Sequence, residues 1–444
     1  MNKNKKNTVD RESIVEKRGN FLALLPIAFF LIIYIGVSII FSDFYLMSVV
    51  VAFLFALLVA CLQNKALSFE DKLSVMASGA ADKNIVTMIL IFLCAGIFAG
   101  ILGRDGATAV ADLLLSFIPA KFSVLVMFIV ACFVSTAMGT SVGTITVISP
   151  IGVAVSSITG ISPVLMIASI VGGAMFGDNL SFISDTTIAA TSTQGCKMKD
   201  KFRENFIIAL PAALLTMGIL LVIAFTGGEV NNYIAGDINL WLLLPYFLVL
   251  IGGVVGINVF VVLIGGIVVA TVVRLALGGG VAAVISSMGS GASGMFEVII
   301  VTLLVSMLSA LMRAFGGFDA LLYGIKRVFR GRVGGQMGIS ALVGLMDVAT
   351  ANNTVAIVMA APIAKTISEE YGITNTKTAS LLDIFGSVVQ GLIPYGAQLL
   401  IATQITGISA AEMLPYMFYQ YLLAISAIVF MFLPSVKLQK KKKS

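Results

Sequence analysis

The sequence predicts an all-α polytopic membrane protein, built as an inverted repeat with discontinuous helices and about 10–12 transmembrane segments. Three observations predict this fold class. Only 11% of the 444 residues are charged and 59% are hydrophobic, whereas soluble globular chains carry about 25% charged residues. Apolar runs of membrane-spanning length recur along the chain. Clusters of glycine, hydroxyl and carboxylate residues interrupt several of these runs.

The apolar runs predict the elements in order. The first, 21–41, has the length of a spanning helix rather than of a signal peptide, so we expect a retained first helix. Further helices are expected near 44–61, 84–103, 122–139, 163–176, 205–225, 240–257, 258–277, 297–315, 334–348, 378–402 and 415–434. Shorter or interrupted segments are expected at 140–158 and 350–366, and amphipathic or re-entrant pieces at 106–118 and 317–329. The glycines within 278–280 and 289–291 are interpreted as a flexible connection between helices.

Lysine and arginine crowd both ends of the chain, from Lys3 to Arg18 and from Lys437 to Lys443. Positive residues mark the cytoplasmic side of membrane spans, so we expect both termini in the cytoplasm and a multi-pass protein of the inner (cytoplasmic) membrane. Flanking of a membrane explains these charges without nucleic acid as a partner. The expected organisation is a basic N-terminal segment 1–20, a first half 21–228, an extracytoplasmic linker 229–239, a second half 240–436 and a basic tail 437–444.

The two halves share an ordered set of motifs. Thr140, Pro150, Gly160 and Gly177 of the first half match Thr350, Pro362, Gly372 and Gly391 of the second. The offset between matching residues drifts from 210 to 214. These matches predict an internal repeat.

Loop charges predict that the two halves have opposite orientations. The basic loop 197–203 is expected inside, whereas its counterpart 406–412 is acidic and is expected outside. Many secondary transporters are built from such inverted repeats, with the binding site between the halves near the middle of the membrane.

The segment 177–187 is the densest polar cluster of the first half. It holds Asp178 and Asp185 among hydroxyl and amide side chains. Ionisable groups inside a bilayer are costly and mark ion or substrate paths. Oxygen ligands without histidine or cysteine suit a hard cation such as sodium, a proton, or both. Asp178 is the principal candidate, while Asp185 either joins the site or caps a following helix.

A second cluster of the first half, 135–146, combines glycines with serine and threonine hydroxyls. Such residues break a helix and offer carbonyls and helix ends to an ion. They also occur where membrane helices pack closely, so helix packing stays open as an alternative.

The second half offers mostly neutral ligands. Asp347 precedes Asn352, Asn353 and Thr354, and its alternative role is an ion pair with an arginine. Asp383 is either a second titrating group or part of an ion pair or cap. The candidate cation- or proton-binding residues are Asp178, Asn179, Ser181, Asp185, Thr186, Thr187, Thr140, Ser141, Thr144, Asp347, Asn352, Asn353, Thr354 and Asp383. The expected sodium ligands among them are Asp178, Thr140, Thr144 and Asn352.

The string Gly177-Asp178-Asn179-Leu180-Ser181, followed by Ser184-Asp185-Thr186-Thr187, resembles a motif of the NhaC-type sodium/proton antiporters of the ion transporter superfamily. The polar interruptions 139–144 and 352–354 also look like those of that family. The resemblance covers nearly the whole chain after residue 20. It implies a secondary transporter without ATP hydrolysis, with Asp178 and Asp185 as the family's acidic motif. It also implies a group that includes carriers of amino acids and small organic acids.

The sequence is therefore compatible with two functions. The first is sodium/proton exchange at a carboxylate site, and the second is sodium- or proton-coupled transport of an amino acid or small organic acid. A channel or scaffold is disfavoured by the repeat. No enzyme activity is expected. The chain has no histidine for a serine or cysteine nucleophile and lacks a phosphate-binding loop. The carboxylates alone would also suit an intramembrane aspartyl protease, but the repeat argues against it. We expect no cofactor beyond the transported sodium and protons. The expected partners are the lipid bilayer and these ions, with a homodimer left open.

Overall fold

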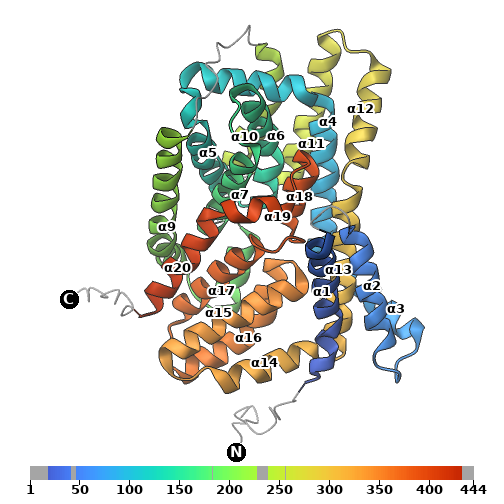
Figure 1. The fold of residues 1–444 in the computed structure, drawn as a ribbon, viewed down its shortest axis with the longest axis vertical. Coiled ribbons are helices and arrows are strands. Elements are labelled where there is room, and N and C mark those ends of the chain that lie inside the picture. The colour runs from blue at the N-terminus through green and yellow to red at the C-terminus, as the bar shows by residue number, and fades with distance from the viewer. Residues whose placement is uncertain (1–18, 42–46, 183, 228–238, 256, 433–444) are drawn as a thin grey trace, which may run out of the picture.

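The computed structural model describes residues 19–41, 47–182, 184–227, 239–255 and 257–432. Within these ranges the chain is helical and has no β-strand. Figure 1 shows an elongated helical bundle in which α1, α2 and α13 lie side by side at the lower right.

The helices of the N-terminal part are α1 (Leu25–Phe41), α2 (Val49–Leu62), α3 (Phe69–Ala80), α4 (Lys83–Phe117), α5 (Ser123–Met138), α6 (Ser141–Thr159), α7 (Pro163–Leu180), α8 (Asp185–Gln194) and α9 (Met198–Thr226). Those that follow are α10 (Leu240–Val254), α11 (Val259–Ala276), α12 (Val281–Ser293), α13 (Phe296–Ala314), α14 (Gly317–Val328), α15 (Gly331–Thr350), α16 (Asn353–Glu370), α17 (Asn375–Gln390), α18 (Ala397–Thr406), α19 (Ala410–Met413) and α20 (Phe418–Phe432).

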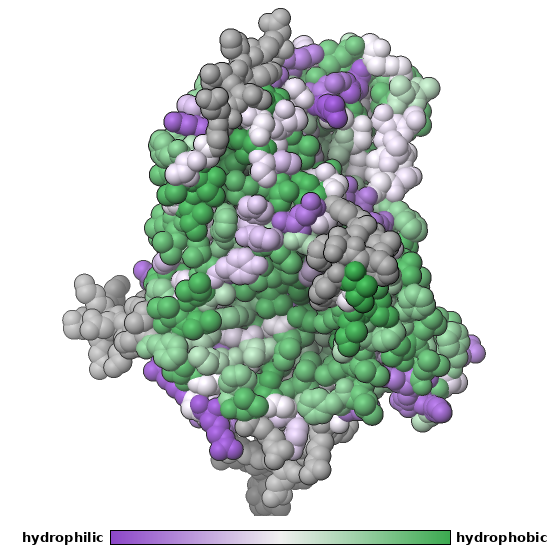
Figure 2. All heavy atoms as spheres, in the orientation of Figure 1, coloured by the Kyte–Doolittle hydropathy of each residue, from purple (hydrophilic) through white to green (hydrophobic). Residues whose placement is uncertain are grey.

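Within the described residues, eight helices are long and apolar enough to cross a membrane, or nine when the bent pair 410–416 and 418–432 counts as one span. Three shorter apolar helices, 21–34, 49–62 and 240–252, accompany them. Exposed apolar side chains such as Phe133, at 73% exposure, face outward. On the face in Figure 2, hydrophobic side chains cover most of the flank, while hydrophilic ones gather near the upper and lower ends. The chain is therefore a multi-pass membrane protein.

Two expectations about local structure were wrong. The glycines and serine of 289–291 lie inside α12 rather than in a flexible connection. They belong there because α12 packs on α4 at backbone contact: a Cβ on Gly291 would lie 2.1 Å from the Gly96 carbonyl oxygen. Small residues permit such close helix packing in membranes. Likewise, Lys201 lies inside α9 and is 1% exposed, although it was expected in a basic loop.

The amphipathic pieces were placed well by the sequence. Residues 106–118 continue α4 beyond a kink at Gly103, whose φ of +57° is left-handed. Residues 317–329 form α14, which follows Gly316, also left-handed. In Figure 1 the cyan second part of α4 lies across the top of the molecule, whereas α14 lies across the bottom. The two halves thus place corresponding pieces at opposite ends, as an inverted repeat requires.

The repeat is more regular than the sequence comparison indicated, because corresponding backbone features lie a constant 212 residues apart. The left-handed residues Gly139, Gly160 and Gly195 correspond to Ala351, Gly372 and Gly407. The N-cap residues Thr140 and Ser162 correspond to Asn352 and Thr374. Thr140 therefore matches Asn352 rather than Thr350, and Asp178 matches Gln390. The boundaries of the two halves stay a prediction.

Candidate functional site

Four helix interruptions meet around one cavity of about 90 Å³. They separate α5 from α6, α7 from α8, α15 from α16, and α17 from α18. Each half of the chain contributes two of them. Every interruption brings a helix C-terminus and a helix N-terminus together, so backbone carbonyls and backbone N–H groups both converge here. The cavity is lined by Thr87, Met88, Ile91, Gly139, Thr140, Ser141, Val142, Asp178, Ser184, Asp185, Thr186, Ala351, Asn352, Asn353, Thr354, Gln390, Ala397 and Gln398.

Asp178 is the buried carboxylate of this cavity, with 7% exposure. It lies in the last turn of α7, and both of its oxygens accept hydrogen bonds from hydroxyl groups. Ser184, the N-cap residue of α8, donates to Oδ1 over 2.5 Å. Ser141, the first residue of α6, donates to Oδ2 over 2.8 Å. Two different interruptions of the first half therefore hold one carboxylate.

A chain of amides connects Asp178 with the second half. Gln390 donates to the Gln398 side-chain oxygen over 2.8 Å, and Gln398 donates to the Ser141 hydroxyl over 3.0 Å. Ser141 in turn donates to Asp178. Each member donates in the same direction, so the carboxylate is the final acceptor. Gln390 is also the repeat counterpart of Asp178, which means that the second half supplies a neutral amide where the first half has a charge.

The hydroxyls around Ser184 have a defined direction as well. A serine hydroxyl has one proton to donate, and that of Ser184 goes to Asp178. Thr186, 2.9 Å from the Ser184 oxygen, must then be the donor of their shared bond. The lone pairs of Thr186 stay available to a cation in the cavity.

Asp185 does not cap α8, because Ser184 is the N-cap residue and Asp185 the first residue of the helix. The Asp185 side chain is exposed and still borders the cavity. A carboxylate in the first turn interacts favourably with the positive end of the helix dipole.

The second half contributes Asn352, Asn353 and Thr354 to the cavity. Asn352 caps α16 by accepting a bond from the Val355 backbone N–H, and its amide donates to the Met88 sulfur over 3.5 Å. Thr87, Met88 and Ile91 of α4 complete the wall. These three residues were not predicted from the sequence, since nothing distinguishes them from other residues of a spanning helix.

A larger cavity of about 510 Å³ lies on the other side of Asn352. It is bordered by α3, α13 and α16, and its lining includes Arg313, Ser309 and Thr350. A neighbouring cavity of about 460 Å³ shares Arg313 with it and reaches α14 through Phe318. We call these two spaces the vestibule. It lies at the α14 end of the molecule, where the Asn20 backbone N–H bonds to the Gly316 carbonyl oxygen.

Six of the predicted residues lie outside the cavity lining. Thr144 is one turn inside α6, and its hydroxyl donates to the Thr140 carbonyl oxygen over 2.9 Å. Ser181 is the C-cap residue of α7. Asn179, Thr187 and Asp383 belong to a separate polar network, described next. Asp347 is fully buried in α15. Neither of its oxygens has a hydrogen-bond partner among the described residues, so the expected ion pair with an arginine is absent there.

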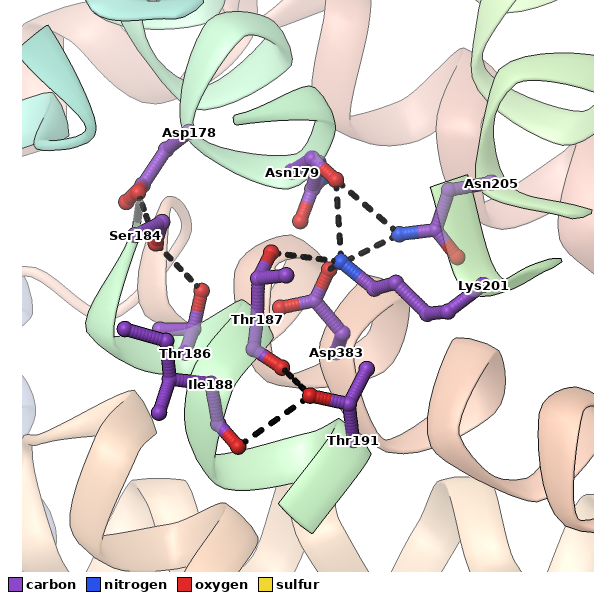
Figure 3. Close-up of polar contacts among 10 residues, drawn as sticks. All are labelled: Asp178, Asn179, Ser184, Thr186, Thr187, Ile188, Thr191, Lys201, Asn205 and Asp383. Atoms are coloured by element: carbon purple, nitrogen blue, oxygen red, sulfur yellow. Dashed lines mark hydrogen bonds and ion pairs between the residues drawn. The ribbon is translucent and has the colours of Figure 1, made fainter. Parts of the chain in front are cut away.

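The separate network is centred on Lys201 and is drawn in Figure 3. The Lys201 ammonium lies 2.6 Å from Asp383 Oδ2, and both side chains are almost completely buried. Asn205 donates to the same Asp383 oxygen over 2.8 Å. Asp383 therefore takes part in an ion pair, which is one of the roles that the sequence allowed for it. Lys201 and Asn205 were not predicted from the sequence as members of a buried network, because the basic neighbours of Lys201 are typical of a charged loop.

A multi-pass bundle whose interrupted helices enclose a polar cavity has the architecture of a membrane transporter. Comparison with known proteins shows to which family of transporters the chain belongs. The sequence profile described as the Na⁺/H⁺ antiporter family matches residues 14–225 and 237–434. The chain belongs to the Na⁺/H⁺ antiporter family.

Two curated relatives come from Bacillus subtilis strain 168. The Na⁺/H⁺ antiporter NhaC is 24% identical over 404 residues, which are 82% of this chain and 88% of NhaC. The malate-2H⁺/Na⁺-lactate antiporter is 26% identical over 196 residues, and this match spans less than half of either protein, 41% of this chain and 42% of the antiporter. Among solved structures, the YdaH transporter of Alcanivorax borkumensis aligns with a TM-score of 0.42 and 16% identity over 93% of this chain and 98% of that chain.

Proposed function

We propose that this protein exchanges sodium for protons across the cytoplasmic membrane and that Asp178 binds either ion. One observation carries the proposal: a buried carboxylate, held by two hydroxyls, faces a small cavity in whose lining the described residues include no lysine or arginine. A carboxylate removed from water needs a compensating charge. Sodium and a proton each supply one positive charge, so the two ions compete for one group. Membership of the Na⁺/H⁺ antiporter family supports the same reading.

The hydrogen bonds provide a way to distinguish the two bound forms. The carboxylate accepts from Ser141 and Ser184. Protonation turns one of its oxygens into a donor and makes that oxygen a poorer acceptor, which weakens the bond from the hydroxyl that faces it. That hydroxyl belongs to α6 or α8, so proton binding weakens the contact between α7 and another helix. Bound sodium, by contrast, leaves the Ser141 and Ser184 hydroxyls donating to Asp178. The ion is coordinated by oxygen lone pairs of Asp178, Thr186 and Thr140.

The ions reach this site from the cytoplasm through the vestibule. Asn352 lines both the vestibule and the cavity around Asp178. The vestibule lies at the same end of the molecule as residue 20, which follows in the sequence the basic segment that is expected in the cytoplasm. A movement of Asn352 and its partner Met88 would join the two spaces.

The test uses purified protein in liposomes with a pH-sensitive dye inside. An imposed sodium gradient should move protons in the opposite direction, and Asp178→Asn should reduce this movement to the rate of empty liposomes. Glu70→Gln is the matched control, because it removes an exposed carboxylate on α3 that does not belong to the cavity lining. Sodium-driven proton flux that persists in Asp178→Asn would contradict the proposal.

A second candidate function is exchange of small organic acids, as the name of the malate-2H⁺/Na⁺-lactate antiporter suggests. The size of the vestibule favours it, because a space of about 510 Å³ is large enough for a small solute. Arg313 borders this space together with Asp82, so its lining holds charges of both signs. The same liposomes decide between the two candidates. Proton movement that appears only after malate or lactate is added would replace sodium/proton exchange by organic-acid exchange.

A further inference from the structure

The ammonium of Lys201 touches three helices besides its own α9. It contacts Asp383 on α17 at 2.6 Å, the Thr187 hydroxyl on α8 at 2.7 Å, and the Asn179 carbonyl oxygen on α7 at 3.1 Å. Figure 3 shows these contacts converging on the one nitrogen atom. A lysine ammonium has three protons to donate, and these three contacts use all of them.

Two of the contacts lie on opposite sides of the interruption between α7 and α8. Asn179 is in the last turn of α7, where backbone carbonyls have no partner within the helix. Thr187 is in the first turn of α8. The residues that form the cation site lie next to these two contacts, since Asp178 precedes Asn179 and Ser184 comes three residues before Thr187. A single buried charge thus bridges the two helix ends that carry the carboxylate and one of the hydroxyls bound to it.

Lys201 does not compensate Asp178 directly. Figure 3 shows its side chain on the far side of Asn179 and Thr187 from Asp178. Its partner is Asp383, which also accepts from Asn205. Asp383 is therefore already neutralised by a resident cation, whereas Asp178 borders the cavity and has no lysine or arginine as an ion-pair partner among the described residues. A buried ion pair of this kind adds little net stability, because desolvation offsets the attraction, so a role in specificity accounts for it better.

We propose that Lys201 is a positioning residue for the cation site: it clamps the two helix ends on either side of Ser184 and, through Asp383, ties them to the second half of the chain. The effect on sodium affinity rests on the proposed function of Asp178. The clamp itself is a statement about structure and is tested separately.

The first experiment measures backbone hydrogen exchange of the purified protein over residues 181–190, in wild type and in Lys201→Met/Asp383→Asn. The double variant removes both charges, which avoids leaving one buried charge unpaired. We expect exchange in this segment to become roughly tenfold faster, the equivalent of about 1.4 kcal/mol, because charge-assisted hydrogen bonds across the interruption are lost. Unchanged exchange would overturn the clamp, whatever the protein transports.

The matched control is Lys377→Met/Glu204→Gln. This pair also connects α9 with α17, at 3.0 Å, and is mostly buried, yet it does not touch α7 or α8. We expect its double variant to leave exchange at 181–190 within about twofold of wild type. An equal acceleration in both double variants would show a general loosening of the two helices and would overturn the specific role of Lys201.

The second experiment measures sodium-driven proton flux of the same variants in liposomes. We expect Lys201→Met/Asp383→Asn to raise the half-saturating sodium concentration roughly tenfold while the maximal rate stays within about twofold, since binding geometry and not the exchanging group is altered. A wild-type sodium affinity would overturn the proposal, as would a lost maximal rate, which would make the pair part of the transport step. If the wild-type protein showed no sodium-driven flux, the function proposed for Asp178 would be refuted. The hydrogen-exchange experiment would still test whether Lys201 holds the two helix ends together.

Discussion

Gly139 and Ala351 adopt the same left-handed backbone conformation, with φ of 69° and 46°, at corresponding places in the two halves. Each ends one helix, and the next residue is the N-cap of the following helix, Thr140 or Asn352. Glycine takes this conformation readily, whereas a residue with a Cβ does so at a cost of about 1–2 kcal/mol. The second half therefore holds a strained residue beside the cation cavity.

This asymmetry predicts opposite effects of two substitutions on stability. Ala351→Gly should raise the free energy of unfolding by about 1 kcal/mol, and Gly139→Ala should lower it by about the same amount or more. Thermal unfolding in detergent measures both. Gly36→Ala in α1 serves as the control, because its backbone is helical and a Cβ there meets nothing within 4 Å. A lower melting temperature for Ala351→Gly would contradict the idea of strain.

The hydroxyl of Ser141 should contribute to sodium affinity. Ser141→Ala removes the donor to Asp178 and the acceptor of Gln398, and so breaks the connection between the halves. We expect the half-saturating sodium concentration to rise about three- to tenfold, the equivalent of one hydrogen bond. Ser149→Ala, at a buried serine of the same helix without a partner among the described residues, is the control. Equal sodium affinities of the two variants would count against the role of Ser141.

Gly177 allows α7 to lie against α5. A Cβ at this position would lie 2.5 Å from the Cys132 carbonyl oxygen and from the Ser135 Cβ. Gly177→Ala should therefore push α7 away and displace Asp178, the next residue. We expect a lower melting temperature together with a weaker sodium affinity. Gly218→Ala in α9, where a Cβ meets nothing within 4 Å, should change neither. A Gly177→Ala protein with wild-type stability and affinity would show that the helices are packed less closely.

The vestibule predicts which serines water can reach. In a variant with its four native cysteines replaced by serine or alanine, Ser309→Cys should react with a membrane-impermeant thiol reagent applied from the cytoplasmic side, because Ser309 borders the vestibule. Ser380→Cys should stay unreactive, since Ser380 is fully buried in α17. Mass spectrometry of the labelled protein gives both rates. Equal rates, or labelling of Ser309→Cys only from the opposite side, would argue against cytoplasmic access.

Part of the candidate site was predictable from local sequence. Asp178, Thr140 and Asn352 stood out because polar residues are costly inside apolar segments, and the structure places all three at one cavity. Thr144 stood out by the same criterion but bonds to its own helix, since a threonine hydroxyl can reach the carbonyl four residues earlier. Composition does not distinguish these two outcomes.

The sequence predicted that the repeat exists, but it did not predict correctly which residues of the two halves correspond. Sequence identity paired Thr140 with Thr350, whereas backbone geometry pairs Thr140 with Asn352 as N-cap residues. Threonine and asparagine both accept a backbone hydrogen bond at an N-cap, so a conserved local structure permits different residues. Identity of residue type was thus a weaker guide than the role of the residue at the helix end.

The sequence by itself determined the membrane class, the approximate position of most spanning helices and the cluster around Asp178. These properties depend on local composition and on the cost of placing polar groups in a bilayer. The tertiary structure alone decided that Lys201 is buried against Asp383, that α4 completes the cavity, and that Gln390 and Gln398 lead to Asp178. Such pairings join residues of different helices, and a side chain's partner is set by how the helices pack rather than by its neighbours along the chain.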